Sequence, residues 1–258
     1  MSEGPRRRYR FKVEYDGSDF FGWQIQPGRR TIQGHLEEAF STLLREKITI
    51  IGAGRTDSGV HALGQVAHFD ASGAPLDAQA LTGRLNGYLD PDVSIRDLRR
   101  APRRFHARAS ATGRRYRYHL AFRKSPLLRA RAWYTPGEVD PGILRAETDA
   151  LLGKHDFRAF CARSGRGQNT ECEIRVAEWK AWADGVYLEI EGDRFLHHMV
   201  RNLIGTLVPI ARGRWPGPTV PEILAGGDRR LAGPTAPARG LCLVHVYYRP
   251  RPDARAAP

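Results

Sequence analysis

The chain has 258 residues, of which 41% are hydrophobic, and its 41 lysines and arginines against 28 aspartates and glutamates give a net charge of +13. This length can bury a substantial core, as one large domain or as two halves, and the charge predicts a polyanionic partner. No apolar run approaches the roughly 20 residues of a membrane span, and no secretory signal, disulfide framework or zinc knuckle is indicated, so we expect a cytoplasmic protein.

The first elements are predicted by alternation and then by helical spacing. Residues 10–15 alternate apolar and charged side chains, which indicates a half-buried strand. The aromatic segment 20–23 follows a turn, and we expect its rings to pack in the core or a loop rather than to stack on bases. Thr31 is placed to cap a helix with apolar residues at helical spacing up to Leu44.

The stretch 48–69 reads as strand, polar turn and strand. Its turn, Arg55-Thr56-Asp57-Ser58-Gly59, contains one carboxylate between a guanidinium and a hydroxyl, with glycines on both sides. Glycines allow a tight turn, so this loop is expected to display Asp57 rather than to bury it. Aspartate, serine and glycine are also ordinary turn formers, and the pentapeptide alone does not assign a catalytic role.

Further elements follow on the same principles. A helix is expected over 77–89, a strand over 93–98, and a strand over 116–122 that packs an aromatic face and leaves an arginine face outside. Tyr116 comes first in the aromatic row, so its ring could be accessible at the mouth of this strand. Short arginine clusters, most of them expected to be solvated, lie at 6–8, 99–100, 103–104, 114–117 and 129–131.

The Arg- and Pro-rich connection 127–136 is the expected seam between two halves, 1–130 and 131–250, followed by a disordered tail, 251–258. The second half is expected to contain a mobile basic loop at 162–170 and a helix over 195–211 that places Arg201 on the flank of its apolar stripe. The remaining expected elements are a helix over 141–152, strands over 175–183 and 186–191, a short helix from 221 and a last strand over 241–248. This order fits an α+β fold of two similar halves that share one sheet.

Five blocks that run in order along nearly the entire chain resemble the tRNA pseudouridine synthase A family. They are YDGSDFFGWQ, GAGRTDSGVHALGQVAHF, FHARASATGRRYRY, FLHHMVRNLIGTL and GLCLVHVYY. The resemblance implies the pseudouridine synthase fold, a mixed and mostly antiparallel central sheet with flanking helices. It also implies isomerisation of uridine to pseudouridine without a cofactor.

The same resemblance assigns roles to five positions. Asp57 would be the nucleophile, Arg201 its buried ion-pair partner, and Arg55 the residue that takes the place of the extruded nucleotide or clamps the neighbouring phosphate. Tyr116 would stack on the target base. Leu243 matches an apolar position near the pocket, although a place in the core of the last strand explains it more simply.

The resemblance also implies partners: the anticodon arm of tRNA, modified at positions 38 to 40, and a homodimer across which the tRNA lies. The arginine clusters would then form a continuous basic groove that contacts RNA shape and phosphate. Two departures stand out. Ser58 replaces an alanine that is common in the family, and the 162–170 loop shows no clear family pattern.

Other chemistries are less well supported by the residues. Adjacent histidines on a helix, such as His197 and His198, point about 100° apart and seldom chelate one ion, so no metal is expected. Ser58 lacks the Gly-x-Ser-x-Gly context of a nucleophile, and no second carboxylate that a retaining glycosidase would need is evident near Asp57. The alternatives that stay open are a non-catalytic RNA-binding or ribosome-associated protein and a metal-dependent RNA hydrolase.

Overall fold

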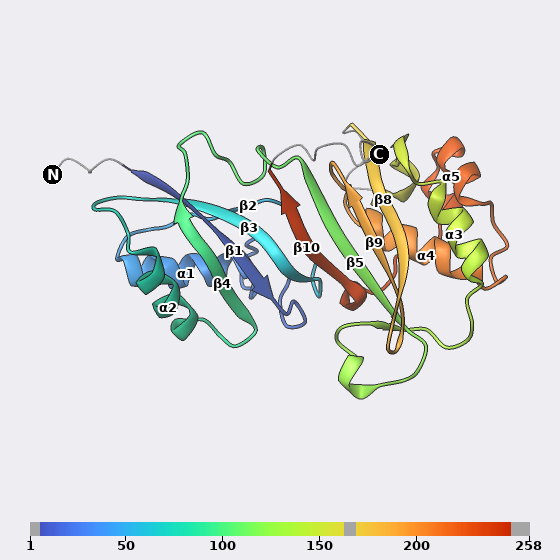
Figure 1. Ribbon diagram of the computed structural model, residues 1–258, viewed down its shortest axis with the longest axis horizontal. Helices are drawn as coiled ribbons and strands as arrows, with labels where there is room; N and C mark the ends of the chain where they lie inside the picture. Colours follow the sequence, from blue (N-terminus) through green and yellow to red (C-terminus); the bar gives the residue numbers. More distant parts are fainter. Residues whose placement is uncertain (1–5, 163–168, 249–258) are drawn as a thin grey trace, which may run out of the picture. The chain divides into compact units, whose positions relative to one another are not determined.

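The computed structural model (Figure 1) describes residues 6–162 and 169–248. The chain packs as two units, Met1–Thr112 with Leu243–Pro258, and Gly113–Cys242, which we call unit 1 and unit 2. The expected disordered tail, 251–258, and residues 163–168 of the expected mobile loop lie outside the described residues.

Unit 1 contains an antiparallel sheet formed around the first strand, β1 (Arg7–Tyr15). The strand order is β4–β1–β3–β10, and the short β2 pairs with β3. The other strands are β2 (Ile51–Gly52), β3 (His61–Ala71), β4 (Val93–Arg100) and β10 (Leu241–Tyr247). The strands expected near 10–15, 93–98 and 241–248 are thus confirmed.

The core of unit 1 lies between this sheet and its two helices, α1 (Ile32–Leu44) and α2 (Ala78–Tyr88), which lie side by side (Figure 1). The Phe11 ring of β1 lies 4.9 Å from the Phe40 ring of α1 between centroids. The expected cap is confirmed, since the Thr31 hydroxyl accepts a hydrogen bond from the Gly34 amide at 3.3 Å. Such caps satisfy backbone donors that the first turn of a helix leaves without partners.

Unit 2 also combines a sheet with helices, and its strand order is β5–β9–β8–β7. These strands are β5 (Gly113–Ala121), β7 (Gly153–Asp156), β8 (Glu171–Trp182) and β9 (Gly185–Gly192), and the short β6 (Trp133–Tyr134) pairs with β5 in parallel. The helices are α3 (Pro141–Asp149), α4 (Met199–Ala211) and α5 (Val220–Gly226). The α+β class with a mixed, mostly antiparallel sheet is therefore confirmed.

The arginine face expected outside β5 is instead paired with buried acids. Arg115 donates to Glu191 at 2.7 Å, and Arg117 donates to Glu189 at 2.8 Å. Burial alone would raise the pKa of Glu189, but hydrogen bonds from Arg117 and Lys180 hold it below its ordinary value. These two arginines therefore stabilise the sheet, a role that strand alternation alone could not reveal because their partners lie on β9.

Helix α4 begins four residues later than the apolar stripe predicts. His198 adopts a left-handed backbone conformation (φ 61°) just before Met199, which ends the regular helix on that side. His197 and His198 thus precede the helix, and their ring centroids lie 4.0 Å apart. The helical geometry used to argue against chelation by this pair is wrong, and the expected absence of a metal stays a prediction.

The expected seam between residues 130 and 131 falls inside unit 2. β5 lies before it and β6 after it, yet the two strands pair with each other, Leu120 opposite Trp133. Within the described residues, no helix is both long enough and apolar enough to cross a membrane.

Burial makes one histidine of unit 1 a pH-sensitive element of the fold. His68 is 2% exposed, and its Nδ1 accepts a hydrogen bond from the Ala107 amide at 3.1 Å. Burial, and then the positive charges of Arg8 and His106, lower the pKa of His68 from 6.5 to about 4. Between these two values the unfolded chain binds a proton that the folded chain does not, so stability falls as the pH falls.

We expect acidification from about pH 7 to about pH 4.5 to cost the wild type roughly 2–3 kcal/mol more than a His68→Gln variant. The glutamine oxygen can still accept the Ala107 amide, but the side chain does not titrate. Urea unfolding of both proteins at both pH values measures the difference. Equal losses in the two proteins would show that His68 does not contribute this pH dependence.

Candidate active site

The loop between β2 and β3 carries Asp57, and the residue before it anchors that loop to the core. Thr56 is 7% exposed, and its hydroxyl lies 2.8 Å from the Tyr15 hydroxyl. The Thr56 carbonyl accepts a hydrogen bond from the Trp23 amide at 3.0 Å. Both the side chain and the backbone of Thr56 are thus satisfied inside unit 1, which fixes the start of the Asp57 turn.

The other side of the turn is anchored to a different carbonyl. Ser58 Oγ donates to the Phe20 carbonyl at 3.1 Å, and the Gly59 amide approaches the same oxygen at 3.4 Å. Between these anchors Asp57 is half-buried, while Arg55 is exposed and makes no hydrogen bond or ion pair with any residue in 6–162 or 169–248. Asp57, which the sequence predicts to be displayed by the loop, is thus only partly accessible.

The segment 17–24 is the support for this loop. Gly22 has a φ of +81°, and a Cβ there would lie 2.6 Å from the Thr56 carbonyl oxygen, so both conformation and space require glycine. Phe20 and Trp23 are 1% and 2% exposed, which confirms core packing for these two rings. Phe21 is 43% exposed, with the Arg29 guanidinium 4.5 Å from its ring centroid.

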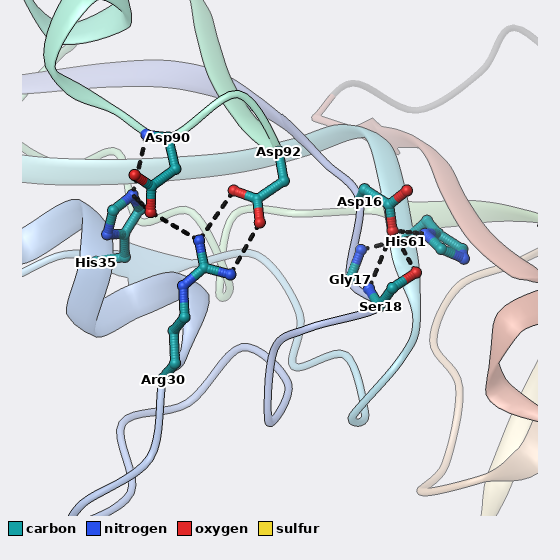
Figure 2. A network of polar contacts seen from close by, with 8 residues as sticks. All are labelled: Asp16, Gly17, Ser18, Arg30, His35, His61, Asp90 and Asp92. Carbon is teal, nitrogen blue, oxygen red and sulfur yellow. Dashed lines mark hydrogen bonds and ion pairs between the residues drawn. The ribbon is translucent and has the colours of Figure 1, made fainter. Parts of the chain in front are cut away.

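A charged network holds the supporting segment in place (Figure 2). The Arg30 guanidinium lies between the carboxylates of Asp90 and Asp92, at 2.8 Å from each, and the Arg30 Cζ lies 3.9 Å from the centroid of the Phe20 ring. The hydrogen bond from Arg30 lowers the pKa of Asp90 below its ordinary value. Arg30 therefore connects the turn after α2 to Phe20, whose carbonyl holds the Asp57 loop.

The second cluster in Figure 2 joins the end of β1 to the start of β3. Asp16 accepts hydrogen bonds from the amide and hydroxyl of Ser18 at 3.0 and 2.6 Å, and lies 3.2 Å from His61 Nδ1. The Gly17 amide lies 3.1 Å from the same nitrogen. Because His61 follows the Asp57 loop directly, this turn fixes where the loop ends.

Arg201 is held in unit 2 by hydrogen bonds to the loop that follows α5. Its Nε donates to the Ala236 carbonyl at 2.8 Å, and the Ala236 amide donates back to the Arg201 carbonyl at 3.1 Å. The neighbouring Pro237 carbonyl accepts from the Tyr118 hydroxyl at 2.7 Å. Burial raises the pKa of that hydroxyl, against the opposing effect of Arg201 and Arg239, so Tyr118 remains a donor.

Close contact between α4 and the loop after it reinforces this arrangement. A Cβ on Gly205 would lie 1.7 Å from the Pro234 carbonyl oxygen, so only glycine lets the loop approach the helix. Asn202 is 1% exposed, and it donates to the Phe160 carbonyl at 2.7 Å and accepts from the Thr235 hydroxyl at 2.7 Å. The arginine and asparagine of the HHMVRN block thus bind two loops to the first turn of α4.

The structure places the five expected site residues as follows. It brings Asp57 and Arg55 together in one loop of unit 1, and it places Leu243, which is 0% exposed, on β10. Tyr116 and Arg201 belong to unit 2. The Tyr116 ring, expected to be accessible, is only 8% exposed and lies edge-on to Phe195, with centroids 5.1 Å apart. The ion pair between Asp57 and Arg201 stays a prediction.

Sequence reasoning missed the residues that hold the loop in place. The alternating pattern identifies Tyr15 only as one apolar residue of a strand, and no pattern in the sequence analysis singles out Arg30. Asn202 lies in the block FLHHMVRNLIGTL, which resembles the family, but the sequence assigns no role to this residue. The only available signal was the position of these residues within or beside the five blocks.

A family model and several known proteins similar to this chain carry the same description. A family model described as tRNA pseudouridine synthase matches residues 12–108 and 148–249. A protein of Myxococcus xanthus named tRNA pseudouridine synthase A is 43% identical over 96% of this chain and 94% of its own length. Proteins of the same name from Pseudoalteromonas atlantica and Geotalea uraniireducens are 41% and 39% identical, over 95% and 94% of this chain and 93% and 100% of their own lengths.

A solved structure titled a dye-decolorizing protein from V. cholerae aligns with 95% of this chain and 93% of its own, at 10% identity and a TM-score of 0.20. A likeness this weak carries no argument about fold or function.

The Arg30 network generates a prediction about the loop. We expect Arg30→Ala to lower the free energy of unfolding by about 1 kcal/mol, because two ion pairs and a cation–π contact are lost. We also expect amide hydrogen exchange in residues 57–60 to become faster, since Phe20 is less well held. Urea unfolding and hydrogen–deuterium exchange measure the two effects.

Arg29→Ala is the matched control, because Arg29 is the neighbouring arginine and lies over the exposed ring of Phe21. We expect it to leave exchange in 57–60 unchanged. If both variants accelerate exchange there equally, Arg30 has no specific role in holding the loop.

Proposed function

The chain belongs to the tRNA pseudouridine synthase family, and from this premise we propose that it isomerises uridines 38, 39 and 40 in the anticodon arm of tRNA, with Asp57 as the nucleophile and without a cofactor. The single observation that supports this proposal most directly is the geometry of the Asp57 loop. A half-buried carboxylate lies between two positions that are hydrogen-bonded into the core. A protein that only bound RNA would not need such a carboxylate, because the chain carries a net charge of +13 that attracts RNA and the carboxylate would repel it.

The reaction makes limited chemical demands. The bond from C1′ to N1 of uridine breaks, the uracil turns, C1′ joins C5, and the proton on C5 is released to solvent while N1 gains one. No electrons enter or leave, so the residues need only hold a charged carboxylate against an extruded base. Asp57 would supply that carboxylate and serve as the nucleophile.

The other site residues have supporting roles in this proposal. Arg201 would form an ion pair with Asp57. Two hydrogen bonds between Arg201 and Ala236 hold the arginine in one position, as such a pair would require. Arg55, which is exposed, would fill the place of the extruded nucleotide or clamp its phosphate.

Tyr116 and Leu243 would line the pocket for the base. The Tyr116 ring is covered edge-on by Phe195, so Phe195 would have to move when the base enters. Leu243 is completely buried in β10 and would contribute only an apolar wall.

We further propose that the protein works in the cytoplasm as a homodimer, with the tRNA lying across both subunits. Its contacts would be mostly to phosphates and to RNA shape, so binding should weaken steeply as salt rises.

The test is release of tritium from tRNA labelled at uridine C5, with chelator present and no added cofactor. We expect release from a tRNA whose labelled uridines lie at 38 to 40. We expect none from the same tRNA with cytidine at those positions and label elsewhere. Metal-dependent cleavage of the tRNA without tritium release would favour a hydrolase, and tight binding with neither release nor cleavage would favour an RNA-binding protein.

A further inference from the structure

Phe21 is the one aromatic residue of the segment 17–24 that does not pack in the core. It is 43% exposed, whereas Phe20 and Trp23 on either side are 1% and 2% exposed. The sequence treats the three rings alike, so the structure is what separates Phe21 from its neighbours. The question is therefore what an exposed ring at this position can contact.

The two residues that flank Phe21 both contact the Asp57 loop. The Phe20 carbonyl accepts a hydrogen bond from the Ser58 hydroxyl at 3.1 Å. On the other side, a Cβ on Gly22 would lie 3.1 Å from the carbonyl carbon of Asp57, so the Gly22 backbone packs directly against the peptide that follows Asp57. Phe21 therefore lies beside the loop that carries the proposed nucleophile.

Contacts with the rest of the segment fix Phe21 although it is exposed. Its amide donates to the Arg30 carbonyl at 2.9 Å, and its carbonyl accepts from the Gln26 side-chain amide at 2.7 Å. The Arg29 guanidinium lies over the ring, 4.5 Å from its centroid. Because these contacts already restrict the residue, a ligand that stacks on its ring loses little additional entropy on binding.

Extrusion of a nucleotide uncovers a surface that such a ring can cover. When one base leaves the stack, the bases on either side of it lose a stacking partner, which is part of the cost of extrusion. An aromatic side chain can replace that partner, and it accepts any base because every base has a π face. With Arg29 over one face of the Phe21 ring, a base would stack on the other face.

We propose that Phe21 stacks on a base that flanks the target uridine once that uridine is extruded. The inference rests on the proposed function, because it takes extrusion beside Asp57 as the event that uncovers the flanking base. This role differs from those proposed for Arg55 and Tyr116, which concern the vacated place and the target base itself. The contact stabilises the extruded state with little preference for the identity of the flanking base.

A contact with another protein chain fits this ring less well. Within residues 17–30, Ile25 is the only other exposed large hydrophobic residue, and Arg29 brings a charge to the same place. Stable protein interfaces bury about 800 Å² on each partner, which is far more than two side chains supply. A single base, by contrast, matches the size of one ring.

The test compares two substitutions of Phe21 in the binding of a tRNA that carries one target uridine. Phe21→Leu keeps an apolar side chain but removes the flat ring, whereas Phe21→Tyr keeps a ring. A base–aromatic stack contributes about 5- to 100-fold in affinity. We expect Phe21→Leu to lose affinity in this range and Phe21→Tyr to stay within about twofold of the wild type.

Tyr88→Leu is the matched control, because Tyr88 is 45% exposed and lies on α2 of the same unit. We expect it to bind tRNA as the wild type does. Equal losses in Phe21→Leu and Tyr88→Leu, or in Phe21→Leu and Phe21→Tyr, would overturn the proposal. So would a change of sedimentation mass in Phe21→Leu, which would identify the ring as a contact between copies.

A double-mutant cycle then identifies the base. One tRNA lacks the base on the 5′ side of the target uridine, and another lacks the base on its 3′ side. Against one of these two tRNAs, the wild type and Phe21→Leu should bind equally, because the stacking partner is already absent. If Phe21→Leu loses the same factor against both as against the intact tRNA, its ring does not stack on a flanking base.

These binding measurements do not depend on catalysis. If the wild type releases no tritium but the cycle shows coupling, the proposed function fails while the contact between Phe21 and a flanking base stands. If tritium is released and the cycle shows no coupling, the proposal for Phe21 alone fails.

Discussion

The buried contact between the hydroxyls of Tyr15 and Thr56, 2.8 Å apart, is the constraint from which the Asp57 loop follows. It holds the residue before the carboxylate in the core of unit 1, while Asp57 itself is half-buried. The Phe20 carbonyl then accepts both Ser58 and Gly59 and fixes the far side of the turn. The residues on both sides of Asp57 are thus fixed to the core, which is the support that the nucleophile role proposed for Asp57 would need.

Sequence patterns predicted the strands and helices well where periodicity is strong, as in β1, α1 and the strand after Asp57. The strand expected before Asp57, from residue 48, is reduced to the two residues of β2. The patterns failed where a single backbone conformation overrides them. The left-handed His198 ends α4 on its N-terminal side, although the apolar stripe continues to Leu196. The candidate site could be located because its motif is local, but its support by Arg30 and Asn202 depends on partners that are distant in sequence.

Some arginines of this chain are paired with buried glutamates and others are exposed, and the number of arginines alone does not distinguish the two groups. Arg115 and Arg117 are paired with buried glutamates and stabilise the sheet of unit 2. Arg99, Arg100 and Arg104 are exposed, and of these Arg99 lies close enough to Asp97 for its charge to help lower the pKa of that carboxyl. The first group is satisfied within the fold, so the proposed contacts to RNA rest on the second. The continuous basic groove expected from the resemblance stays a prediction.

The most direct test of this account is single-turnover tritium release from C5-labelled tRNA by Asp57→Asn, with Ser58→Ala as the neighbouring control. The account expects Asp57→Asn to lose at least about 10⁴-fold in rate, as removal of a catalytic residue does, while its affinity for tRNA stays near that of the wild type. Ser58→Ala should remain nearly as active as the wild type, because it loses one part-buried hydrogen bond worth about 1 kcal/mol while the Gly59 amide still bonds the Phe20 carbonyl. A near-wild-type rate for Asp57→Asn would contradict the account.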